Sequence, residues 1–318
     1  MGRTEDVGAA LGGIGEGARP SIQAGVDALQ RRFGTLPDDD GREDGRPPVF
    51  LMAAGWRTGS TLLQRLLVSD GSMLVWGEPY DHSASIRRLA EMLAPFDDHW
   101  PPDRYLVEGR GDIAPDQWLA NRYPHPLDFL GAHRSFLDRL FAEPARRAGF
   151  ARWGVKTVRL GGDHATYLRA VYPTAPMVFL VRNPYDAFLS YRMLHDVRPS
   201  SSWWYHRWPD VQVSTPSQFG ALWQAQVSSF TDVAHDLGAM FVSFESLTSG
   251  SALAEVARFV DVAVEPSTLR ARVGASSEQR HAPTMEQATL SIDEIRELRA
   301  VVDPLAGDLG YAGPSARS

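Results

Sequence analysis

Beyond Pro48, hydrophobic positions along the chain follow two alternating patterns. Short, continuous apolar runs such as VFLMAA (49–54) and PMVFLV (176–181) are typical of buried strands. Most of these runs precede a segment whose apolar residues recur at helical spacing. The expected strands are residues 49–54, 73–76, 153–158, 176–181 and 240–244, and the expected helices are residues 61–69, 127–147, 164–171, 185–194, 252–260 and 292–302. This alternation predicts an α/β fold, with a mainly parallel central sheet flanked by helices on both faces.

The first 46 residues differ from the rest because Gly, Asp, Glu and Arg dominate them. We expect residues 1–46 to form a flexible tail and residues 47–313 to form the folded domain. Within the tail, Ile22, Val26, Leu29 and Phe33 share one helical face. Two alternatives stay open for this segment, a short helix docked on the domain and disorder.

Composition and charge narrow the class of protein. A chain of 318 residues with 43% hydrophobic side chains can bury one sizeable core. The net charge of −7 argues against a nucleic-acid partner. The absence of cysteine excludes a disulfide framework, a thiolate metal site and a cysteine nucleophile. Because the chain has neither an apolar run of membrane-span length nor the apolar core of a secretory signal, we expect no membrane span and a cytoplasmic location.

The loop GWRTGS (55–60) lies between the first expected strand and its helix. Ligands of parallel α/β sheets bind at the carboxyl ends of strands, and free backbone N–H groups at a helix N-terminus attract anions. The loop therefore indicates a phosphate or sulfate site, and the alternative is a tight turn with Thr58 or Ser60 as the helix cap. A nucleoside-triphosphate loop normally has Gly-Lys before its hydroxyl, whereas here Arg57 precedes Gly59.

Two segments resemble the signature of sulfotransferases that use 3′-phosphoadenosine 5′-phosphosulfate (PAPS). GWRTGSTLL resembles their 5′-phosphosulfate loop, and VFLVRNPYDAFLSYR (178–192) resembles their 3′-phosphate segment. The resemblance implies a P-loop-like α/β fold. It assigns the 5′-phosphosulfate to Arg57, Thr58, Gly59, Ser60 and Thr61, and the 3′-phosphate to Arg182 and Ser190. An arginine at a strand end and a serine two helical turns later are able to converge on one phosphate.

Catalytic residues are implied by two further stretches. MLVWGEPYDH (73–82) resembles the Glu-Pro stretch of carbohydrate sulfotransferases and the matching glutamate of tyrosylprotein sulfotransferases, which makes Glu78 the expected base. His82 is the rival base, since cytosolic small-molecule sulfotransferases use a histidine. WGVKTVRL (153–160) resembles the lysine-bearing strand of the same branches and assigns Lys156 to the sulfuryl or bridging oxygens. The alternative for Lys156 is a strand-end lysine in water.

The remaining similarity is weaker. MFVSFESL (240–247) resembles the family's stretch beside the adenine, with Phe244 in place of the usual tyrosine. GASSEQRHAP (274–283) resembles a loop over the phosphosulfate, which implies contacts from Ser276 and Arg280. The resemblance spans residues 49–283 and is strong only at the two phosphate motifs.

The implied function is sulfuryl transfer from PAPS to a hydroxyl of a small-molecule, natural-product or glycan acceptor, leaving adenosine 3′,5′-bisphosphate (PAP). Arg57, Lys156 and the loop amides are expected to stabilise the leaving phosphate, and no metal is required. The aromatic stretch SSWWYHRWPD (201–210) is suited to holding a sugar ring, a phenol or a lipid-like acceptor, or it folds under its own tryptophans. Alternative functions are a nucleotide kinase and a catalytically silent nucleotide-binding module. The sequence does not predict the oligomeric state.

Overall fold

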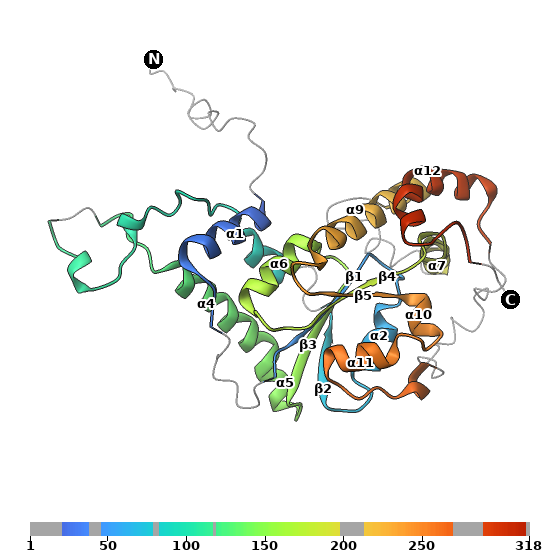
Figure 1. Ribbon diagram of the computed structural model, residues 1–318, viewed down its shortest axis with the longest axis horizontal. Coiled ribbons are helices and arrows are strands. Elements are labelled where there is room, and N and C mark those ends of the chain that lie inside the picture. The colour runs from blue at the N-terminus through green and yellow to red at the C-terminus, as the bar shows by residue number, and fades with distance from the viewer. Residues whose placement is uncertain are drawn as a thin grey trace, which may run out of the picture.

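A computed structural model describes residues 21–37, 46–78, 83–116, 119–197, 213–269 and 289–315 (Figure 1). Its centre is a five-stranded, wholly parallel sheet in the order β2-β3-β1-β4-β5. The strands are β1 (Val49–Ala53), β2 (Met73–Gly77), β3 (Arg152–Thr157), β4 (Met177–Val181) and β5 (Met240–Ser243). All five residues of the central strand β1 are buried, which explains its uninterrupted apolar sequence. The predicted parallel α/β sheet is confirmed.

Helices cover both faces of the sheet. Figure 1 shows α6 and α9 on one face, and α2, α10 and α11 on the other. The α-helices are α1 (Ile22–Phe33), α2 (Ser60–Leu67), α3 (Ser85–Glu91), α4 (Pro126–Leu137), α5 (Glu143–Arg147), α6 (Gly162–Val171), α7 (Pro184–Val197), α9 (Pro216–Ala234), α10 (Phe244–Thr248), α11 (Leu253–Val260) and α12 (Ile292–Asp308). Short 3₁₀ turns occupy Asp103–Tyr105, Arg110–Asp112 and Pro266–Leu269. No helix within these described ranges has both the length and the apolar character needed to cross a membrane.

Of the two alternatives for residues 22–33, the structure shows the docked helix. Val26 and Leu29 of α1 are each only 1% exposed, and the helix packs on α6 and α4. Residues 1–20 and 38–45 lie outside the described ranges. The apolar face of α1 therefore belongs to the core, although the surrounding composition resembles a tail.

The helix expected at residues 127–147 is interrupted. The chain leaves α4 through a π-helical turn, Asp138–Ala142, and resumes as α5 with Pro144 in its first turn. A proline has no N–H to donate to the preceding turn, so it fits a helix start better than a helix interior.

Helix α9 was not among the expected elements, although its sequence carries clear signals. Thr215 caps the helix through its side chain, and Pro216 stands in the first turn. Phe219, Trp223 and Val227 then follow at four-residue spacing, and all three are buried.

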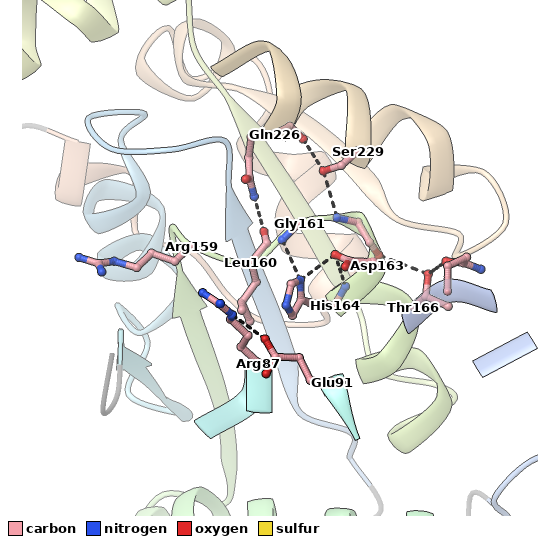
Figure 2. Close-up of polar contacts among 12 residues, drawn as sticks. Arg87, Glu91, Arg159, Leu160, Gly161, Asp163, His164, Thr166, Gln226 and Ser229 are labelled. Carbon is pink, nitrogen blue, oxygen red and sulfur yellow. Dashed lines mark hydrogen bonds and ion pairs between the residues drawn. The ribbon is translucent and has the colours of Figure 1, made fainter. Parts of the chain in front are cut away.

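Helix α9 also holds the turn between β3 and α6 (Figure 2). The Gln226 side chain donates to the Leu160 carbonyl, and the Gly162 N–H donates to the Ser229 hydroxyl over 3.0 Å. A Cβ atom at Gly162 would lie 1.9 Å from the Ser229 carbonyl oxygen, so only glycine permits this approach. The contacts fix the connection that follows the strand bearing Lys156.

Candidate functional site

Four strand ends meet at one edge of the sheet. Arg57 lies in the loop after β1, Glu78 directly follows β2, Arg182 directly follows β4, and Phe244 follows β5. Because all strands are parallel, these residues share the carboxyl edge, where ligands of such sheets bind.

The β1–α2 loop ends in a glycine that its surroundings require. Gly59 precedes the first residue of α2 with φ of 90°, a left-handed conformation that favours glycine. A Cβ atom there would also lie 2.2 Å from the Phe244 ring. The loop backbone therefore packs directly on the aromatic ring that follows β5, and the first N–H groups of α2 have no side-chain cap.

The hydroxyls of this loop have different surroundings. Thr58 is fully buried, and its hydroxyl donates to the Gly55 carbonyl over 3.1 Å, which stabilises the loop itself. Ser60 is buried at the start of α2, whereas Thr61 is exposed. Neither Thr58 nor Ser60 caps the helix, so the alternative interpretation of an ordinary capped turn is wrong for this loop.

Arg57 joins the two phosphate motifs. Its backbone is left-handed, with φ of 63°, which is uncommon for a residue other than glycine and concentrates at functional sites. Its Nε donates to Ser190 Oγ of α7 over 2.9 Å, and its carbonyl accepts from Arg182 Nη1 over 2.7 Å. The structure thus brings Arg57, Arg182 and Ser190 together.

Arg182 lies in an environment that fits an anionic ligand. Its guanidinium stands 4.2 Å from the centre of the Phe244 ring, and Trp223 Nε1 donates to its carbonyl over 3.0 Å. Its Nε is buried and has no hydrogen-bond partner among the described residues. Burial lowers the pKa of Arg182, while the Asp186 and Glu245 carboxylates act in the opposite direction. A phosphate at this place would supply both a counter-charge and a missing acceptor.

Glu78 and Lys156 form an ion pair across neighbouring strands. Gly77 of β2 is in register with Lys156 of β3, and the Glu78 N–H donates to the Lys156 carbonyl over 2.8 Å. The Lys156 ammonium donates to the Glu78 carboxylate. The Lys156 side chain is 7% exposed and that of Glu78 is 31% exposed, so the structure excludes a lysine in bulk water. Glu78 also has a left-handed backbone, with φ of 44°.

Three residues of this edge are absent from the expected site. Trp223 and Glu245 hold the turn after β4, with Glu245 Oε1 accepting the Asn183 N–H over 3.1 Å. Arg159, just beyond β3, lies 5.8 Å from the Trp56 ring centre and points away from the Arg87–Glu91 ion pair (Figure 2). A basic residue directly after a strand was the available signal for Arg159, whereas Trp223 belongs to the unexpected helix α9.

Several expected contributors cannot be placed. His82, Ser276, Arg280 and the aromatic stretch at 201–210 lie outside the described residues. Within the described ranges, no group of three or more His, Asp and Glu side chains is arranged to hold a metal ion.

The chain is similar to a protein family and to solved structures of low sequence identity. Residues 47–263 match the model of the sulfotransferase family. Similar solved structures include a sulfotransferase domain from the Synechococcus PCC 7002 olefin synthase, with 14% identity, 86% of this chain and 98% of that chain covered, and a TM-score of 0.44. A sulfotransferase from Alicyclobacillus acidocaldarius has 15% identity, with 84% and 97% covered and a TM-score of 0.42. Mouse sulfotransferase SULT7A1 complexed with PAP has 14% identity, with 86% and 74% covered and a TM-score of 0.36. No curated protein sequence matches the chain.

Proposed function

Because the chain belongs to the sulfotransferase family, we propose that it transfers a sulfuryl group from PAPS to a hydroxyl of a small-molecule, natural-product or glycan acceptor. The observation that carries this proposal is the direct contact between the two phosphate motifs. Arg57 binds Ser190, and Arg182 binds the Arg57 carbonyl, so one nucleotide is able to engage both motifs at once.

The described residues fit the donor nucleotide. At its 5′ end, the N–H groups at the start of α2, with Ser60, Thr61 and the Arg57 guanidinium, would bind the phosphosulfate. At its 3′ end, Arg182 and Ser190 would bind the phosphate, with the buried Arg182 Nε as the donor that lacks an acceptor. When bound, PAPS supplies the sulfuryl group and a phosphate leaving group.

The residues around the transfer position have two roles, stabilisation of the leaving group and acceptance of the proton. Arg57 and Lys156 place positive charge where negative charge grows on the leaving oxygen, which is the usual source of rate enhancement in such transfers. Glu78 accepts the proton of the acceptor hydroxyl as general base. The ion pair with Lys156 holds the Glu78 carboxylate beside the end of β2, so base and cation stay in a fixed relation. Ser276 would add a contact to the phosphosulfate.

The two alternative functions differ from this one in measurable ways. A nucleotide kinase would bind ATP with Mg²⁺, but the Gly-Lys pair of its loop is missing at residues 55–61. A silent nucleotide-binding module would bind PAP and transfer nothing.

A thermal-shift comparison tests the donor class first. We expect PAP to raise the melting temperature well above the effect of ATP with Mg²⁺ at the same concentration, because only bound ligand stabilises the fold. Stronger stabilisation by ATP with Mg²⁺ would reject the proposal in favour of a kinase. Transfer from radiolabelled PAPS to a panel of phenols, sugars and alcohols then separates an enzyme from a silent module.

A further inference from the structure

The chain does not end at α12 but continues along the turn that follows Arg182. The C-terminal segment Tyr311–Ser315 contacts this turn, the start of α7 and the helix α10 that follows β5. Asn183 Nδ2 donates to the Gly313 carbonyl over 2.8 Å, the Ser315 hydroxyl donates to the Asp186 carboxylate, and the Tyr311 hydroxyl donates to Glu245 Oε2 over 3.1 Å. Burial and then the Glu245 carboxylate raise the pKa of Tyr311, so its hydroxyl is a neutral donor.

The two carboxylates held by this segment are the ones that act on Arg182. Asp186 and Glu245 both favour the charged guanidinium, yet neither forms an ion pair with it in the described part of the chain. Glu245 instead divides its oxygens between the Asn183 N–H and the Tyr311 hydroxyl. Asp186 is 9% exposed and is engaged by Ser315.

We propose that Tyr311 and Ser315 are positioning residues that hold the Glu245 and Asp186 carboxylates off Arg182, which keeps its guanidinium available for a phosphate. This inference rests on the proposed function, because it treats Arg182 as the 3′-phosphate ligand. A carboxylate released near a partly buried arginine would pair with it, since a charge-assisted bond is stronger than a neutral one. The nucleotide would then compete with an internal ion pair.

The decisive variant is Tyr311→Phe, which removes one hydroxyl and keeps the ring. We expect PAP to bind about threefold to tenfold more weakly, the range of one neutral hydrogen bond, while 5′-AMP, which lacks the 3′-phosphate, binds as before. Calorimetry with both nucleotides gives the ratio of the two dissociation constants. Tyr185→Phe is the matched control, because its hydroxyl also donates to a carboxylate, that of Asp303, over 2.8 Å, and that contact joins α7 to α12. The control is expected to leave the ratio unchanged.

Glu245→Gln separates positioning from simple support of the fold. Glutamine keeps an oxygen for the Asn183 N–H but has no charge to offer Arg182. Adding Tyr311→Phe to Glu245→Gln should therefore have no further effect on PAP binding. A loss that persists in the double variant, or an equal loss for PAP and 5′-AMP, would overturn the inference.

Ser315→Ala provides an independent test near the chain end if Tyr311→Phe does not fold. It should lower the preference for PAP over 5′-AMP in the same direction, by releasing Asp186. An unchanged preference would remove Ser315 from the inference. If the unaltered protein shows no preference for PAP over 5′-AMP, the assignment of Arg182 in the proposed function fails, whatever the variants do.

Discussion

Ser190 of α7 accepts a 2.9 Å hydrogen bond from Arg57 Nε, across 133 positions of sequence. Each residue lies in a different strand-loop-helix unit, and the contact exists because β1 and β4 are neighbours in the sheet. The relation places a residue of each phosphate motif within reach of one nucleotide.

Arg182→Ala is expected to weaken PAP binding by about tenfold to a hundredfold, the value of one charge-assisted contact. Binding of 5′-AMP should change little, since that nucleotide has no 3′-phosphate. Calorimetry with both nucleotides makes the measurement. Arg192→Ala is the matched control, because Arg192 lies on α7, the helix that follows Arg182, but pairs with Glu294. Equal losses for the two nucleotides would remove Arg182 from the 3′-phosphate site.

Glu78→Gln should lower turnover by about a hundredfold or more, the usual scale for a lost general base, with near-native nucleotide affinity. His82→Ala should be comparatively mild. Single-turnover transfer from labelled PAPS, alongside calorimetry, reports both quantities. An active Glu78→Gln together with an inactive His82→Ala would make the histidine the base.

Lys156→Met should reduce both turnover and stability, because it leaves the Glu78 carboxylate without its cation. Since Glu78 is partly exposed, we expect a loss of about 1–2 kcal/mol in unfolding free energy, below the cost for a fully buried pair. Urea unfolding of Lys156→Met, Glu78→Gln and the double variant forms a cycle. The double variant should lose less unfolding free energy than the two single variants lose together. A loss equal to that sum would show that Lys156 and Glu78 are not energetically coupled.

Gly59→Ala should abolish nucleotide binding or destabilise the protein by about 1–3 kcal/mol, since the added methyl meets Phe244 and the left-handed backbone disfavours alanine. Gly55→Ala is the control, because Gly55 has φ of 84° in the same loop but nothing within 4 Å of the added Cβ. The difference between the two variants, followed by thermal melting and PAP binding, isolates the contact with Phe244. Phe244→Ala should partly rescue Gly59→Ala, and a failure of rescue would point to backbone strain alone.

His133 should make stability depend on pH in mildly acidic solution. Burial lowers the pKa of His133 to about 4, with its Nδ1 beside the Tyr167 hydroxyl at 3.2 Å. In the unfolded chain this histidine takes up a proton near pH 6.5, whereas in the folded chain it stays neutral down to about pH 4. The free energy of unfolding is therefore unaffected by this histidine above pH 6.5 and decreases as the pH falls from 6.5 toward 4. The slope is at most about 1.4 kcal/mol per pH unit. Chemical unfolding between pH 4 and 7 gives the free energy of unfolding at each pH. This free energy should vary less with pH in His133→Gln than in the unaltered protein. His235→Gln, which changes an exposed histidine, should show the same pH dependence as the unaltered protein.

Local pattern was enough to predict the sheet, and the resemblance to a known signature was enough to propose both phosphate motifs. A buried strand is recognised by its continuous apolar run, and a phosphate loop lies within a single strand-loop-helix unit. Recognising either feature therefore needs no information from distant parts of the chain. Because each signature segment is short and continuous, its resemblance was enough to propose Arg57, Arg182 and Ser190 as site residues. The break between α4 and α5 was missed because apolar spacing continues through Pro144.

Tertiary structure alone decided which of these residues touch. Lys156 meets Glu78 because β2 and β3 are adjacent and Gly77 is in register with Lys156, and strand order is not encoded in hydrophobic periodicity. The hydrogen bonds from Trp223 to the Arg182 carbonyl and from Tyr311 to Glu245 likewise join residues that only the packing of the elements brings together. Periodicity reports which face of an element is buried, whereas partners far apart in sequence are chosen by how the elements pack.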